Sequence, residues 1–190
     1  YVAFYALVVL AAGFHFYGII FAVLPFFMTK PWTGKTYIIL IGVLFVMLTF
    51  ESTLTAFIEA SDEMGKHVDT GEVFNEYTMN YLRVLVYAVV PIMTFVFRKK
   101  IFEDSSPAEN LFVNMSIICF LVNSVGLVSA ANMFSRLATY FEFGTIISLP
   151  IVVNKSFDKE TAKTVMVIAM VCYFGYFLSF IISYIINISF

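Results

Sequence analysis

Four charged or histidine side chains interrupt the apolar runs of this 190-residue chain at similar positions: His15, Glu51, Arg83 and Arg136. A charge inside a lipid bilayer costs at least about 2.5 to 3.5 kcal/mol even on lenient insertion scales, so such residues usually serve a function. Two arginines are suited to phosphate, because the guanidinium group stays charged and pairs with phosphate oxygens through two hydrogen bonds. Glu51 or His15 could accept a proton. These residue types predict a site for a phosphorylated ligand.

The surrounding sequence has the composition of a membrane protein. It is 61% hydrophobic and 13% charged, with a mean hydropathy of +0.92. We expect an all-α, polytopic transmembrane helix bundle that forms a single membrane domain over residues 1–190, because the polar segments are too short for a soluble domain. A net charge of −2 gives no indication of nucleic-acid binding. The chain begins at Tyr1 without a basic leader, and we expect it to be the C-terminal part of a longer protein.

Six apolar segments have the approximate length of a membrane span. They are residues 1–28, 36–59, 79–97, 111–130, 133–153 and 164–187. The first is too long to cross a bilayer core of about 30 Å as one straight helix. Because Gly13, His15 and Gly18 cluster within it, we expect this helix to be broken or strongly tilted near His15.

Basic residues fall in alternate connections between the spans: Lys30 and Lys35; Arg98, Lys99 and Lys100; Lys155, Lys159 and Lys163. By the positive-inside rule these connections are cytoplasmic, which predicts a multi-pass plasma-membrane protein. The opposite loop, residues 61–78, is acidic and should lie outside the cytoplasm. Both ends of the chain are then predicted to be extracytoplasmic.

A similar depth is shared by His15, Glu51, Arg83 and Arg136. At about 1.5 Å per helical residue, they lie about 20 to 26 Å from the cytoplasmic ends of their spans. Asn123 lies just beneath this layer, at about 18 Å, and Glu142 is slightly deeper still. Helical spacing groups further polar residues into three stripes: Asn132, Arg136 and Tyr140; Asn80, Arg83 and Tyr87; Glu51, Thr55 and Glu59. Stripes that face one another would form a wet cavity open to the outside.

Each of these residues also has a structural interpretation. Arg83 and Arg136 could extend their charged ends to the membrane surface. Glu51 could serve simply to neutralise an arginine, and His15 could be a hydrogen-bonded core histidine. Glu142 faces away from Arg136 on the same helix, so a structural role for it is supported as well as a functional one.

We expect no metal and no other cofactor in this layer. Two arginines would repel a divalent cation, and the layer holds one histidine. His67, with the nearby acidic residues of the 61–78 loop, could at most bind a metal weakly. The sequence contains no glycine-rich phosphate loop, nucleophile elbow or zinc-protease motif.

Two segments resemble the EpsG family of bacterial exopolysaccharide-synthesis membrane proteins. Ala11-Ala12-Gly13-Phe14-His15, followed by an aromatic-rich run to Phe27, resembles that family's Phe-His helix. Phe134-Ser135-Arg136-Leu137-Ala138-Thr139-Tyr140-Phe141-Glu142 resembles its Arg-x-x-x-Tyr-Phe segment, which ends at a proline, here Pro150. The resemblance covers nearly the whole chain.

The resemblance implies a Wzy-like polymerase that joins polyprenyl-diphosphate-linked oligosaccharide repeats at the outer face of the plasma membrane, together with other polysaccharide-assembly proteins. Such an enzyme would be a metal-independent glycosyltransferase. His15 and Arg136 carry over from the family motifs, whereas Glu51 and Arg83 rest on their depth alone. We expect Arg136, His15 and Glu51 to be catalytic, with either Glu51 or His15 as the base. We expect substrate binding by Arg83, Tyr140, Asn132, Asn123 and Glu142.

Three other functions stay open. A transporter or lipid-linked saccharide flippase could use the same charges as an ion or proton relay, but it would need a polar path to the cytoplasmic side. Few charged residues lie below the layer, which favours an enzyme. An O-antigen ligase or membrane acyltransferase would use the same leaflet with a different acceptor. A non-catalytic assembly subunit is the third possibility.

Overall fold

The computed structural model describes residues 2–14, 16–63, 80–127 and 131–188, and this part of the chain contains eight helices and no strand. In chain order they are α1 (Val2–Phe14), η1 (Phe16–Met28), α2 (Gly34–Glu63), α3 (Tyr81–Val96), α4 (Arg98–Ile101), α5 (Pro107–Val125), α6 (Ala131–Ser156) and α7 (Lys159–Ile188). The all-α prediction is confirmed.

Three helices are long and apolar enough to cross a membrane. They are α5, α6 from Phe134 to Ser156, and α7 from Lys159 to Ser179. The shorter apolar helices are α1, the Gly18–Met28 part of η1, the Gly34–Thr49 part of α2, and α3. Each predicted span therefore corresponds to a helix or, for the first, to two helices. The chain is an integral membrane protein.

The first predicted span consists of two helices, as the break predicted near His15 implies, because α1 ends at Phe14 and η1 begins at Phe16. The two helices fold back on each other. Gly18 makes this close approach possible, since a Cβ atom on it would lie only 3.1 Å from the carbonyl carbon of Ala11. A side chain at this position would push the two helices apart.

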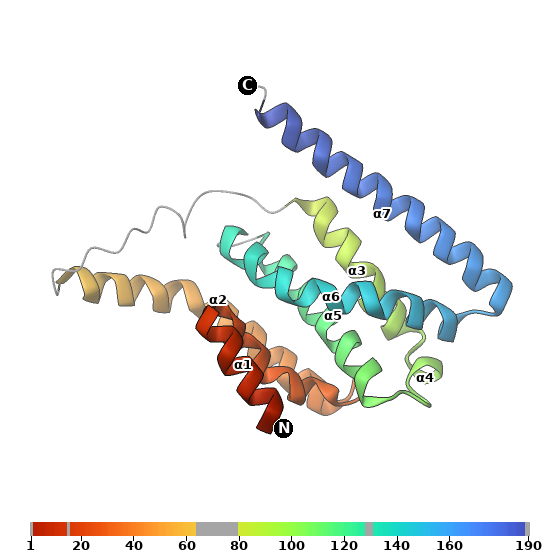
Figure 1. Cartoon of the computed structure of the whole chain (residues 1–190), viewed down its shortest axis with the longest axis horizontal. Helices are drawn as coiled ribbons and strands as arrows, with labels where there is room; N and C mark the ends of the chain where they lie inside the picture. Colours follow the sequence, from red (N-terminus) through yellow and green to blue (C-terminus); the bar gives the residue numbers. More distant parts are fainter. Residues whose placement is uncertain (1, 15, 64–79, 128–130, 189–190) are drawn as a thin grey trace.

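This reversal makes the first apolar segment a helical hairpin rather than one straight helix. The start of α1 lies at the same end of the bundle as the η1–α2 turn, whereas α7 ends at the opposite side of the molecule (Figure 1). That both ends of the chain are extracytoplasmic stays a prediction.

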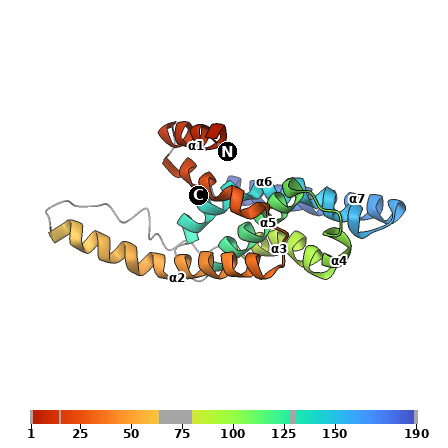
Figure 2. The same cartoon turned by 90° about the horizontal axis from the view of Figure 1, so that it is seen from below.

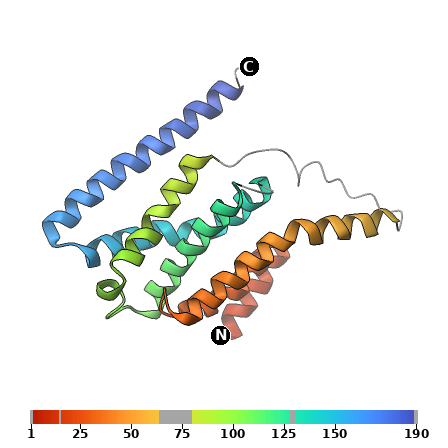
Figure 3. The same cartoon turned by 180° about the vertical axis from the view of Figure 1, so that it is seen from behind.

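The core forms where α5 crosses α6. Gly144 of α6 lies so close to α5 that an added Cβ would be within 2.8 Å of the Phe112 carbonyl oxygen. Ser116 accepts a hydrogen bond of 3.3 Å from Thr145 across the same contact. Small residues allow two helices to approach closely in this way. In Figure 3, α7, α3, α5 and α2 follow one another across the bundle.

Two helices extend away from this core. Seen from below, α1 stands above the other helices, and the C-terminal part of α2 projects beyond the bundle (Figure 2). The α2 helix has 30 residues and is therefore about 45 Å long. Its first half packs against the core, through residues such as Met47.

The predicted cytoplasmic end is held together by its lysines. Lys30 donates to the carbonyl oxygen of Phe102 at 2.9 Å, and Lys100 donates to that of Ser156 at 2.9 Å. Lys155 forms an ion pair of 2.7 Å with Glu109. These contacts gather the alternate basic connections at one end of the bundle, as the sequence predicted. That this end is cytoplasmic stays a prediction.

Candidate functional site

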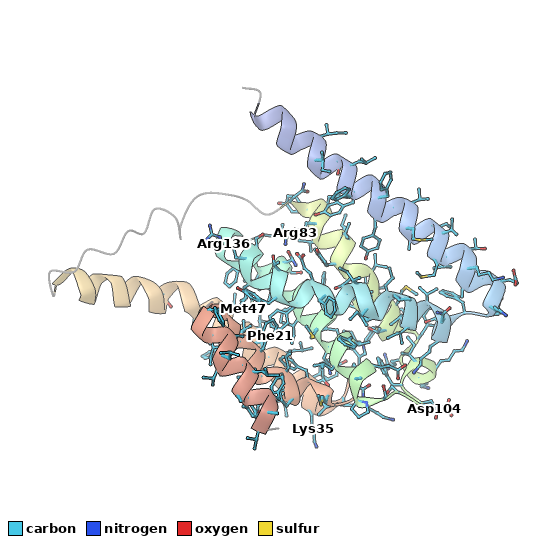
Figure 4. The ribbon with its side chains drawn as sticks, in the orientation of Figure 1. Phe21, Lys35, Met47, Arg83, Asp104 and Arg136 are labelled. Atoms are coloured by element: carbon cyan, nitrogen blue, oxygen red, sulfur yellow. The ribbon has the colours of Figure 1, made fainter. Side chains whose placement is uncertain are left out.

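Arg83 and Arg136 lie at the end of the bundle opposite these lysines. Both occupy the first turns of their helices, α3 and α6. Figure 4 shows the two arginines at the upper end of the bundle and Lys35 at the lower end. The predicted common depth of the two arginines therefore corresponds to a common end of the folded bundle.

Arg83 bridges α3 and α6. Its Nη2 donates to Glu142 Oε1 at 2.5 Å, forming an ion pair, and its Nη1 donates to Ser135 Oγ at 2.6 Å. The guanidinium carbon also lies 5.9 Å from the centre of the Tyr87 ring. Asn80, the first member of the predicted stripe, caps α3 by accepting a 2.8 Å hydrogen bond from the Leu82 amide.

Glu142 thus has a definite partner that the sequence did not predict. Ser135 and Glu142 are seven residues apart, two helical turns, and so share one face of α6. The spacing of seven residues indicates that Ser135 and Glu142 can share a partner. Nothing in the sequence indicates that this partner comes from α3. The pair neutralises the charge of Arg83, which reduces its suitability as a phosphate ligand.

Arg136 lies on a different face of α6. It shares its face with Tyr140, whose ring contacts Phe21 of η1 with 5.7 Å between the ring centres. Arg136 is exposed and makes no hydrogen bond or ion pair with any residue of the described ranges. The two arginines therefore share a depth but lie at different faces of α6: Arg83 of α3 reaches the face that carries Ser135 and Glu142, and Arg136 lies on the face that carries Tyr140.

The η1 and α2 helices lie on the Arg136 side of the bundle. His15 falls between α1 and η1 and is outside the described residues, as is the side chain of Glu51. Met47 is buried in a core cluster with Phe134 of α6. Position 51 lies one helical turn beyond Met47 on the same face of α2. In Figure 4, Met47 lies on the side of the bundle that also carries Phe21 and Arg136.

Asn123 has a different environment from the other predicted residues. It is fully buried on α5, and its Nδ2 donates to the Cys119 carbonyl oxygen at 2.7 Å. Its Oδ1 has no hydrogen-bond partner among the described residues. A ligand could reach Asn123 only if α5 and α6 moved, so its predicted role in substrate binding stays a prediction.

Several predicted features lie outside the described residues. They are the side chain of Asn132 and nearly all of the acidic 61–78 loop, including His67. Within the described ranges, no three His, Cys, Asp or Glu side chains lie close enough together to hold a metal ion.

Two tyrosines of α7 join the Arg83 side, and the sequence did not single them out. Tyr173 donates from its hydroxyl to the Val86 carbonyl oxygen of α3 at 3.3 Å. Tyr176 follows three residues later in the same helix. Their spacing of three residues places them on one face of α7.

The fold and these residues define an integral membrane protein with two arginines at one end of its helix bundle. Arg83 is paired with Glu142, and Arg136 has no ion-pair partner among the described residues. Charged residues in such a position usually mark a functional site. The chain belongs to the EpsG family, whose model matches residues 1–190, and this family is associated with exopolysaccharide biosynthesis. No match was found among curated proteins or among solved structures.

Proposed function

We propose that the protein is a polysaccharide polymerase. It joins polyprenyl-diphosphate-linked oligosaccharide repeats at the outer face of the plasma membrane. Membership of the EpsG family supports a role in polysaccharide assembly. The observation that carries the proposal is Arg136, an exposed guanidinium group without a partner in the described ranges, at the end of the bundle predicted to be extracytoplasmic.

Arg136 binds the diphosphate of the lipid-linked donor. In the reaction, the hydroxyl oxygen of an acceptor sugar forms a bond to the anomeric carbon of the donor, and the bond from that carbon to the diphosphate oxygen breaks. The leaving diphosphate gains negative charge, which the guanidinium group stabilises. The proton of the acceptor hydroxyl passes to Glu51 or His15, which acts as the general base.

The neighbours of Arg136 position the same ligand. Tyr140 and Asn132 lie one turn on either side of Arg136 on its face of α6, and they offer hydrogen-bonding groups to the diphosphate or the first sugar. Arg83 and Glu142 contribute to substrate binding from the adjacent face of the helix. Asn123 supports this end of α6 from the core.

The test is the length distribution of lipid-linked polysaccharide in cells that carry Arg136→Ala in the full-length protein. We expect single repeats to accumulate at normal protein level, with polymerisation slowed about 100-fold or more, as for the loss of one stabilising donor. Arg98→Ala is the matched control, because Arg98 is an exposed arginine at the opposite end of the bundle. Its chain lengths should be normal.

An unchanged distribution of long chains in Arg136→Ala would refute the assignment of Arg136. Arg136→Lys separates charge from geometry, since lysine keeps the charge but cannot form the bidentate contact. We expect this variant to be impaired, although less than the alanine variant.

A further inference from the structure

The residues around Arg83 form a polar and aromatic cluster that the proposed chemistry at Arg136 does not use. We call it the α3–α6 cluster, and it consists of Arg83 and Tyr87 of α3 with Ser135 and Glu142 of α6.

This cluster is poorly suited to a diphosphate. The guanidinium group of Arg83 already forms an ion pair with the Glu142 carboxylate, with 2.5 Å between Nη2 and Oε1. A phosphate brought to the same arginine would face the negative charge of Glu142, and like charges at close range repel. An anion therefore binds more favourably at Arg136, which forms no ion pair with a described side chain.

The same groups are well suited to sugar hydroxyls. A hydroxyl both donates and accepts, so it can donate to the Glu142 carboxylate and accept from an N–H group of Arg83. Hydrogen bonds to charged groups are stronger than those between neutral groups. Ser135 adds a third polar partner, and the Tyr87 ring offers an apolar face against which the C–H face of a sugar ring can pack.

The cluster is accessible as well as polar. The side chains of Arg83 and Glu142 are 21% and 26% exposed, so a ligand can reach both without breaking the ion pair. Ser135 directly precedes Arg136 in the chain, and the two residues point to neighbouring faces of α6. A saccharide attached to a diphosphate at Arg136 therefore begins next to the α3–α6 cluster.

We infer that the α3–α6 cluster is a saccharide-binding subsite that holds a sugar of the oligosaccharide repeat. This inference rests on the proposed function and assigns separate roles to the two arginines. Arg136 binds the charged diphosphate, and Arg83, held by Glu142, binds neutral hydroxyl groups.

The test measures two ligands separately on the purified full-length protein in lipid nanodiscs. The first is the oligosaccharide repeat released by mild acid from the exopolysaccharide of the producing strain, free of lipid and phosphate. The second is polyprenyl diphosphate without sugar. We expect Glu142→Gln to weaken oligosaccharide binding at least 10-fold, as measured by saturation-transfer NMR, and to leave polyprenyl diphosphate binding unchanged.

Glu109→Gln is the matched control. Glu109 forms an ion pair of 2.7 Å with Lys155, the two side chains are 24% and 28% exposed, and the pair lies at the opposite end of the bundle. Glutamine also retains the capping interaction that Glu109 makes with Ser106. We expect this variant to bind both ligands like the wild type.

Ser135→Ala is the second variant, because it removes a hydroxyl group while leaving the Arg83–Glu142 pair in place. It keeps the test valid if Glu142→Gln does not fold, and we expect it to weaken oligosaccharide binding about 3- to 10-fold.

The inference would be overturned if Ser135→Ala, and Glu142→Gln where it folds, bound the oligosaccharide with wild-type affinity. A wild-type protein that binds polyprenyl diphosphate but not the oligosaccharide would also overturn it, while leaving the proposed function intact. Loss of diphosphate binding in Glu142→Gln with normal saccharide binding would make the cluster an anion site instead. A wild-type protein that binds the oligosaccharide but not polyprenyl diphosphate would refute the proposed function and support the saccharide subsite.

Discussion

Replacing Gly144 by alanine should separate the two central helices. The added Cβ would overlap the Met115 Cβ and would lie 2.8 Å from the Phe112 carbonyl oxygen and 3.0 Å from the Ser116 amide nitrogen. Non-bonded carbon atoms are normally about 3.5 to 4.0 Å apart, so the contact with Met115 is far too close. Two of the three atoms belong to the backbone, and no side-chain rotation can relieve that contact.

The change in the free energy of unfolding follows from two opposing effects. Overpacking a well-packed core costs about 1 to 3 kcal/mol, and a backbone contact places this site near the upper value. Alanine gains about 1 kcal/mol over glycine from its higher helix propensity. The free energy of unfolding should therefore fall by about 2 kcal/mol. The shift should also disturb the Arg83–Glu142 pair, because Glu142 lies two residues from the contact.

The assay is reversible unfolding of the purified protein in mixed micelles at increasing SDS fraction, followed by circular dichroism. Gly42→Ala and Gly175→Ala are the controls, since a Cβ at either position meets no atom within 4 Å. Both should be as stable as the wild type or more stable by up to about 1 kcal/mol. A Gly144→Ala variant that unfolds together with the Gly175→Ala variant would refute the close α5–α6 crossing.

Three further predictions concern contacts that fix the helix ends. Thr94→Val should destabilise the protein by about 1 to 3 kcal/mol and shift the fluorescence of the chain's single tryptophan, because the Trp32 indole N–H donates to Thr94 Oγ1 at 3.1 Å and would lose its partner. Unchanged emission would contradict this contact. Asn114→Leu should loosen the end of η1 and speed its amide hydrogen exchange, since the Asn114 amide donates to two carbonyl groups there at 2.6 and 2.8 Å; equal exchange rates would show that other contacts hold η1. Hydrogen bonds from the hydroxyl and amide of Thr161 lower the pKa of Asp158, so the carboxylate favours the folded start of α7 above its unfolded pKa and this contribution is lost as the pH falls through the lower, folded value. Asp158→Ala should therefore increase exchange in the first turn of α7 at pH 7 but not at pH 2, and an equal effect at both pH values would refute the carboxylate cap.

The sequence was sufficient for the class of fold and for the approximate limits of the helices. Apolar length and composition predict membrane helices because the bilayer imposes a minimum length on every crossing. Clustering of Gly13, His15 and Gly18 predicted the break in the first segment. The sequence did not predict that the chain would reverse there, because either a bend or a hairpin satisfies the same hydrophobic pattern. The packing of Gly18 against α1 decides between them.

In the candidate site, the depth of each charged residue can be read from the sequence, whereas the neighbour that it faces depends on how the helices pack. Counting residues along each span placed Arg83 and Arg136 in one layer, since the helical rise is nearly constant. Which neighbour each side chain faces depends on how the helices are rotated and ordered, and these are set by contacts between distant residues, such as the approach of Gly144 to Phe112. That packing directs Ser135 and Glu142 toward Arg83 and leaves Arg136 on another face of α6. The predicted single layer thus became two adjacent groups, because a distance along a helix is encoded locally and a pairing between helices is not.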